Sequence, residues 1–171
     1  MAPNEPAAIR VAAKNGPRHF VFHPNGKFVY LVNELSAAVL VFSYDAAHGT
    51  WRDIQQASAL PDKFEGKPWA ADIHLTPDGR FLYASERTSS TISAFKVDTE
   101  NGHLTPLGSA ATEKQPRGFA IDPSGHLLAA VGELSNAMSV YAIDGESGAL
   151  RLLQSVPTGK KPNWVEFVAL P

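Results

Sequence analysis

The chain has 171 residues, a formal net charge of −2 at pH 7 and no cysteine. This length allows one domain with a sizeable core, the near-neutral charge argues against a nucleic-acid partner, and the lack of cysteine excludes disulfides and thiol chemistry. No apolar run is long enough to span a membrane, and residues 1–15 hold no signal-peptide core. We therefore expect a cytoplasmic protein with no membrane partner.

A short motif led by a proline recurs along the chain at intervals of about fifty residues. The leading prolines, which are spaced by 51, 48 and 46 residues, are Pro17, Pro68, Pro116 and Pro162. The units that they begin cover residues 16–66, 67–114 and 115–160, followed by a partial unit at 161–171. A period of this length is typical of solenoids, propellers and arrays.

Four strand-like runs follow one another in the first unit. The lead run ends at the turn HPNG of residues 23–26, whose second-position proline and fourth-position glycine fit a type I β-turn. Apolar runs come next at residues 28–32 and 39–44, and a more polar run follows at 51–57. The later units repeat this order, with the equivalent turns at residues 76–79 and 122–125.

Four short strands joined by tight turns predict the blade of a β-propeller, with three apolar strands buried and the polar fourth strand at the outer edge. We expect an all-β chain of about three blades, each of four antiparallel strands. A stray strand is expected at each end, Ala7–Ala13 and Trp164–Leu170. Because exposed strand edges invite pairing, two copies could complete each other's split blades as a homodimer.

Charged residues stand at matched distances from the turn glycines. Eight residues before a turn glycine, or eight after it, stand Arg18, Arg117, Glu34, Arg87 and Glu133. Because equivalent positions in successive blades lie at the same end of a ring, we expect these side chains to converge on one mouth of the channel. On the residues alone, salt bridges between blades would explain the arginines and glutamates about equally well.

Several residues near this cluster have a structural interpretation. His19 follows Arg18 in an alternating strand, so it should point the other way and take part in packing or hydrogen bonding. Asp72 and His74 share one strand face, but two ligands without a third make a poor metal site. We expect them to form a hydrogen-bond network in the second blade, with no metal or other cofactor. Trp69 is expected in packing between strands or blades, as is Trp164.

Spaced motifs of this chain resemble those of the lactonase family of seven-bladed propellers. The motifs are GPRH at 16–19, NEL at 33–35, WAADIH at 69–74, SERT at 85–88 and QPRGF at 115–119. The family includes propeller-type 6-phosphogluconolactonases and the carboxy-muconate lactonising enzyme. The resemblance covers essentially the whole chain and corresponds to the C-terminal half of the family's chain. It implies hydrolysis of a small anionic lactone, a phosphorylated sugar lactone of the pentose phosphate pathway.

The resemblance also implies roles for individual residues. The family's proposed site joins a histidine from earlier blades, two arginines that match Arg18 and Arg87, and a glutamate that matches Glu34. The chemistry of these side chains suggests Glu34 as general base and Arg87 or Arg18 as stabiliser of the oxyanion, with Arg117 and His19 binding the substrate. A muconate-type lactonising cycloisomerase is a variant of this function. A non-catalytic propeller scaffold, or an inactive truncated remnant, is the alternative from another class.

Overall fold

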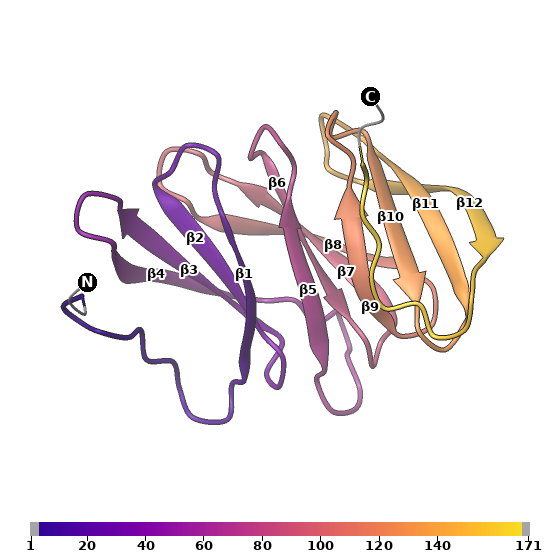
Figure 1. Cartoon of the computed structure of the whole chain (residues 1–171), viewed down its shortest axis with the longest axis horizontal. Coiled ribbons are helices and arrows are strands. Elements are labelled where there is room, and N and C mark those ends of the chain that lie inside the picture. The colour runs from indigo at the N-terminus through magenta and orange to yellow at the C-terminus, as the bar shows by residue number, and fades with distance from the viewer. Residues whose placement is uncertain (1–3, 169–171) are drawn as a thin grey trace.

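The computed structural model describes residues 4–168, which form three antiparallel four-stranded sheets arranged side by side as a fan (Figure 1). The first blade comprises β1 (Pro17–Phe22), β2 (Phe28–Asn33), β3 (Ala38–Asp45) and β4 (Thr50–Ser58). The second comprises β5 (Ala70–Leu75), β6 (Phe81–Glu86), β7 (Thr91–Val97) and β8 (Leu104–Ala111). The third comprises β9 (Pro116–Ile121), β10 (Leu127–Gly132), β11 (Ala137–Ile143) and β12 (Leu150–Pro157). The described residues include no helix that is long and apolar enough to cross a membrane.

The turns between the first two strands of each blade have the predicted geometry. Gly26, Gly79 and Gly125 have φ angles of +71°, +74° and +76°, a region in which glycine meets no steric penalty. Each glycine donates its N–H to the carbonyl three residues earlier, at 2.9, 2.8 and 2.9 Å respectively. The repeated Pro-x-Gly pattern therefore marks the same hairpin in every blade.

The distribution of burial follows the predicted order of strands in two of the three blades. The second strand of each blade is almost wholly buried, and the outer strands β4, β8 and β12 are mostly exposed. The first strand is largely buried in β5 and β9, but the prediction is wrong for β1, where Phe20 and Phe22 are 53% and 44% exposed. β5 packs between β1 and β9, whereas β1 has a neighbouring blade on one side only within the described residues.

The end segments predicted as stray strands form no strand in the described residues. In residues 7–13 and 164–168 the backbone makes no strand pairing, and residues 169 and 170 lie outside the described part of the chain. The N-terminal segment instead covers the first blade, where the Asn4 amide donates to the Gly49 carbonyl at 2.9 Å. Near the other end, the backbone of Asn163 lies against Gly118, and Trp164 is 64% exposed rather than packed.

The blades are joined by a contact that repeats from one interface to the next. The hydroxyl of Tyr30 donates to the Gly102 carbonyl of the second blade at 3.0 Å, and Tyr83 donates to the Gly148 carbonyl of the third at 2.9 Å. A Cβ atom at either glycine would lie 2.5 Å from a phenylalanine ring of the preceding blade. Only glycine fits there, and this close approach fixes how adjacent blades meet.

Candidate active site

A β-bulge interrupts the first strand of every blade at its beginning. The pairing register shifts between Pro17 and His19, between Ala70 and Ile73, and between the partners of Val131 and Gly132. In a bulge two successive residues oppose one residue of the partner strand, so the regular alternation of side chains is lost. The prediction that His19 points away from Arg18 is therefore wrong: Nη1 of Arg18 lies 3.1 Å from Nε2 and 3.3 Å from Nδ1 of His19.

Glu34 is the centre of a cluster that joins the first and second blades. Its Oε1 atom accepts hydrogen bonds from Nη2 of Arg87 and, at 3.0 Å, from Nε1 of Trp69. Nε of Arg18 lies 3.9 Å from the same oxygen. These contacts confirm the expected convergence of Arg18, Glu34 and Arg87, since each residue stands at a matched position at the same end of its blade.

Arg87 is the most rigidly held member of this cluster. Arg87 as a whole is 3% exposed. Its guanidinium lies 3.9 Å from the centroid of the Trp69 ring, within the range of a cation–π contact. It also donates to the carbonyls of Trp69 and Ala70, at 3.1 and 3.0 Å. Nε and Nη2 of Arg87 are thus both engaged by the protein, so Arg87 positions its neighbours and supplies charge.

The surrounding cations determine the ionisation of Glu34. Burial raises the pKa of the Glu34 carboxyl, but the hydrogen bond and charge of Arg87, aided by Trp69 and Arg18, lower that pKa overall. Burial lowers the pKa of Arg87, and its pairing with Glu34 opposes that effect. A carboxylate stabilised in this way is a weak base. The geometry therefore favours Glu34 as a fixed anion that orients two arginines.

Arg117 lies one blade further along the same mouth. Nη1 of Arg117 is 3.8 Å from a carboxylate oxygen of Glu133, and the Arg117 side chain is 41% exposed. Burial is the largest cause of the lowered pKa of Arg87, and the nearby charge of Arg117 also lowers that pKa. The side chain of Arg18 is 17% exposed and that of Arg87 only 2%. Arg117 is thus the most accessible of the three arginines for an incoming anion.

A second cluster surrounds the buried carboxylate of Asp72. Its Oδ1 lies 2.9 Å from Nδ1 of His19, and its Oδ2 lies 3.2 Å from Nε2 of His74. Oδ2 also accepts the Phe119 backbone N–H at 3.3 Å. Burial raises the pKa of Asp72, but these partners lower it overall. The predicted hydrogen-bond network is confirmed, and it ties all three blades together rather than the second alone.

Two residues that matter here were not predicted from the sequence. Trp69, expected in packing, is instead the platform beneath Arg87 and a donor to Glu34. Glu86 is wholly buried and accepts hydrogen bonds from the Trp69 N–H at 2.6 Å and from the N–H and hydroxyl of Ser89 at 2.6 and 2.7 Å. The sequence holds one sign that the second unit differs at the mouth. Pro68 precedes its turn glycine by two residues more than Pro17 or Pro116 does, so the segment that contains Trp69 is longer than its counterparts.

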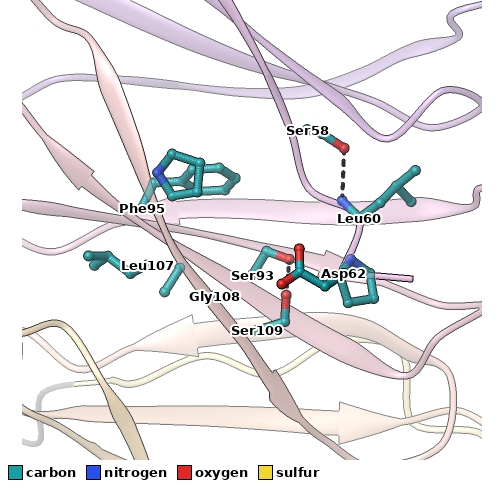
Figure 2. A pocket seen from close by; sticks show the side chains of 11 residues that line it. Ser58, Leu60, Asp62, Ser93, Phe95, Leu107, Gly108 and Ser109 are labelled. Atoms are coloured by element: carbon teal, nitrogen blue, oxygen red, sulfur yellow. Dashed lines mark hydrogen bonds between the residues drawn. The ribbon is translucent and has the colours of Figure 1, made fainter. Parts of the chain in front are cut away.

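A cavity beside the outer strand β8 lies apart from these clusters (Figure 2). The Ser93 hydroxyl, which lines it, bonds to the Ala59 carbonyl at 2.7 Å and to Ser109 at 2.8 Å, while Ser58 accepts the Leu60 N–H at 3.2 Å. Its serines are thus already engaged with the protein, and none of the predicted site residues lines it.

Comparison with known proteins places this arrangement in a family. The family described as "Lactonase, 7-bladed beta-propeller" matches residues 2–167. A 6-phosphogluconolactonase of Pectobacterium carotovorum is 50% identical over 116 residues, which are 68% of this chain and 35% of that protein. One from Sodalis glossinidius is 48% identical over 122 residues, 71% of this chain and 37% of that protein. The chain therefore spans little more than a third of the length of these curated relatives.

Solved structures show the same fold. The periplasmic gluconolactonase of Pseudomonas aeruginosa superimposes with a TM-score of 0.92 at 34% identity, over 99% of this chain and 47% of that one. A protein of Lactobacillus plantarum superimposes with a TM-score of 0.89 at 34% identity, over 94% of this chain and 47% of that one. The three blades therefore correspond to a little under half of each larger structure.

Proposed function

This chain belongs to the lactonase family of seven-bladed β-propellers, and from that premise we propose that its channel mouth takes part in hydrolysing a phosphorylated sugar lactone such as 6-phosphogluconolactone. The sugar lactone is suggested by the names of the relatives, which are 6-phosphogluconolactonases and a gluconolactonase. The observation that carries the proposal is the gathering of Arg18, Arg87 and Arg117 at one mouth, with Glu34 fixed between the first two.

Arg18 and Arg117 suit two different roles in such a reaction. Hydrolysis adds water to the lactone carbonyl carbon and breaks the bond to the ring oxygen, with negative charge developing on the carbonyl oxygen. Arg18 is partly exposed and held in place by Glu34 and by the Ala71 carbonyl, so it suits the stabilisation of that charge. Arg117 has an accessible planar fork that suits a phosphate group.

The experiment compares the hydrolysis of 6-phosphogluconolactone with that of unphosphorylated gluconolactone. The rate of acid release is measured for each, and the rate of spontaneous hydrolysis is subtracted. We expect the Arg117→Gln variant to raise KM for the phosphorylated lactone at least tenfold and to leave KM for the other nearly unchanged. Arg80→Gln is the matched control, since Arg80 is an exposed arginine beside the turn at the opposite end of the blade. Absence of any catalysed hydrolysis would contradict the proposed function, and equal effects on both lactones would contradict the role of Arg117.

The oligomeric state is measured on the same sample. The homodimer expected from the exposed strand edges stays a prediction, and light scattering coupled to size-exclusion chromatography tests it. A monomeric mass at the assay concentration would contradict it.

A further inference from the structure

The Asp72 cluster fixes the protonation of His19. The lowered pKa of Asp72 keeps its carboxylate ionised, and an ionised carboxylate only accepts hydrogen bonds. The ring nitrogens that meet it, Nδ1 of His19 and Nε2 of His74, must therefore each carry a proton. When the His19 ring is neutral, its Nε2 is then the nitrogen without a proton, and this nitrogen is the basic one.

The contact with Arg18 leaves that nitrogen available. Nη1 of Arg18 is nearly equidistant from the two ring nitrogens of His19, at 3.3 and 3.1 Å. These two ring nitrogens are bonded to the same carbon. In the plane of the ring, an atom at these distances from both nitrogens would collide with that carbon. Nη1 of Arg18 therefore lies over the face of the ring. The lone pair of Nε2 lies in the ring plane, so it points past this nitrogen of Arg18.

The His19 ring also borders open space. Its side chain is 39% exposed, and it lines a shallow groove together with Arg18, Asp72, His74 and Trp164. Among residues 4–168, the charged or titratable groups that contact the ring are Arg18 from its own strand and Asp72 from β5, with His74 bonded to the other oxygen of the carboxylate. A small molecule in this groove would meet the imidazole and the guanidinium of Arg18 together.

We propose that His19 is the general base of the reaction and that Asp72 is its positioning residue, an inference that rests on the proposed function. Nε2 takes a proton from the attacking water while the water oxygen bonds to the carbonyl carbon. The bond from that carbon to the ring oxygen then breaks, and the imidazolium returns the proton to the departing oxygen. The product is the open-chain hydroxy acid, and one water is consumed. Arg18, which touches both Glu34 and His19, stands beside the developing oxyanion.

Kinetics on 6-phosphogluconolactone test the assignment. Because a positioned acid–base group contributes about 10²–10⁴-fold, His19→Ala should lower kcat at least a hundredfold with KM changed less than threefold. Added imidazole should restore part of the rate, which a purely structural role would not allow. Asp72→Asn should lower kcat at least tenfold and change the acid limb of the pH profile. His103→Gln, which alters an exposed turn histidine, is the control. A His19→Ala variant with kcat within threefold of the parent would overturn the proposal.

A measurement without substrate separates this proposal from the proposed function. Nitrogen-15 NMR of the parent at pH 8 should show His19 with a protonated Nδ1 and an unprotonated Nε2, and Asp72→Asn should abolish that preference. A parent that hydrolyses no lactone but shows this tautomer refutes the function while supporting the orientation of His19. A protonated Nε2 in the neutral ring refutes the assignment whatever the kinetics give.

Discussion

Replacing Glu86 by glutamine tests how a buried carboxylate organises the mouth. Its two oxygens face two different backbone donors, the Trp69 N–H at Oε1 and the Ser89 N–H at Oε2, both at 2.6 Å. An amide presents one oxygen and one NH₂ group, so in either orientation Glu86→Gln sets a donor against a donor. One charge-assisted hydrogen bond, worth about 1.5–3 kcal/mol, is lost, and a buried N–H loses its partner at a further cost of about 1–3 kcal/mol.

We therefore expect Glu86→Gln to lower the free energy of unfolding by roughly 3 kcal/mol. With a urea dependence of about 2 kcal/mol per molar, the midpoint of unfolding should fall by about 1.5 M. The control is Glu100→Gln, which removes the same charge from an exposed turn. Urea unfolding followed by circular dichroism measures both. If Glu86→Gln shifts the midpoint no further than Glu100→Gln does, the claim that two opposed donors require a carboxylate is wrong.

Three further predictions concern stability, and unfolding measurements check each of them. Tyr83→Phe removes the donor to the buried Gly148 carbonyl and should cost about 1–2 kcal/mol; no measurable loss would show that water replaces the hydroxyl. Gly102→Ala should cost more than Gly26→Ala, because both have positive φ but only a Cβ at Gly102 meets a phenyl ring; equal costs would contradict this. The pKa of Asp72 is lower in the folded chain than in the unfolded chain. Ionised Asp72 therefore adds to the free energy of unfolding above the ordinary aspartate pKa of about 4, and this contribution is lost as the pH falls through the folded-state pKa. The parent should thus lose stability between pH 5 and pH 2.5 more steeply than Asp72→Asn, and parallel profiles would refute the coupling.

The sequence predicts the blades well because its turn chemistry repeats. A Pro-x-Gly turn sets the first hairpin of each blade, and counting from its glycine brings Arg18, Glu34 and Arg87 to one end of the fan. The exposure of β1 was not predictable from its own apolar residues, because burial depends on which blade packs against a strand.

The details of the site depend on backbone pairing, which residue types do not reveal. The bulge that brings His19 beside Arg18 is a shift of register, and an alternating pattern predicts the opposite orientation. Glu86 stands in a polar break typical of a solvated turn, yet the folded chain surrounds it with backbone donors. A charged residue in such a break gives no sign, in one sequence, that it is enclosed.

The repeated contact between blades gives the chain the properties of a short linear array. Within the described residues each blade contacts its immediate neighbours, so the second blade is held at two interfaces and the first and third at one each. In such an array local opening is easiest at the ends. Amide hydrogens of β6 should therefore exchange more slowly than those of β2. Arg87 and Asp72 belong to the second blade, which has two neighbours within residues 4–168, while Arg18 and His19 belong to the first blade, which has one. The site therefore joins a blade expected to open slowly and a blade expected to open faster.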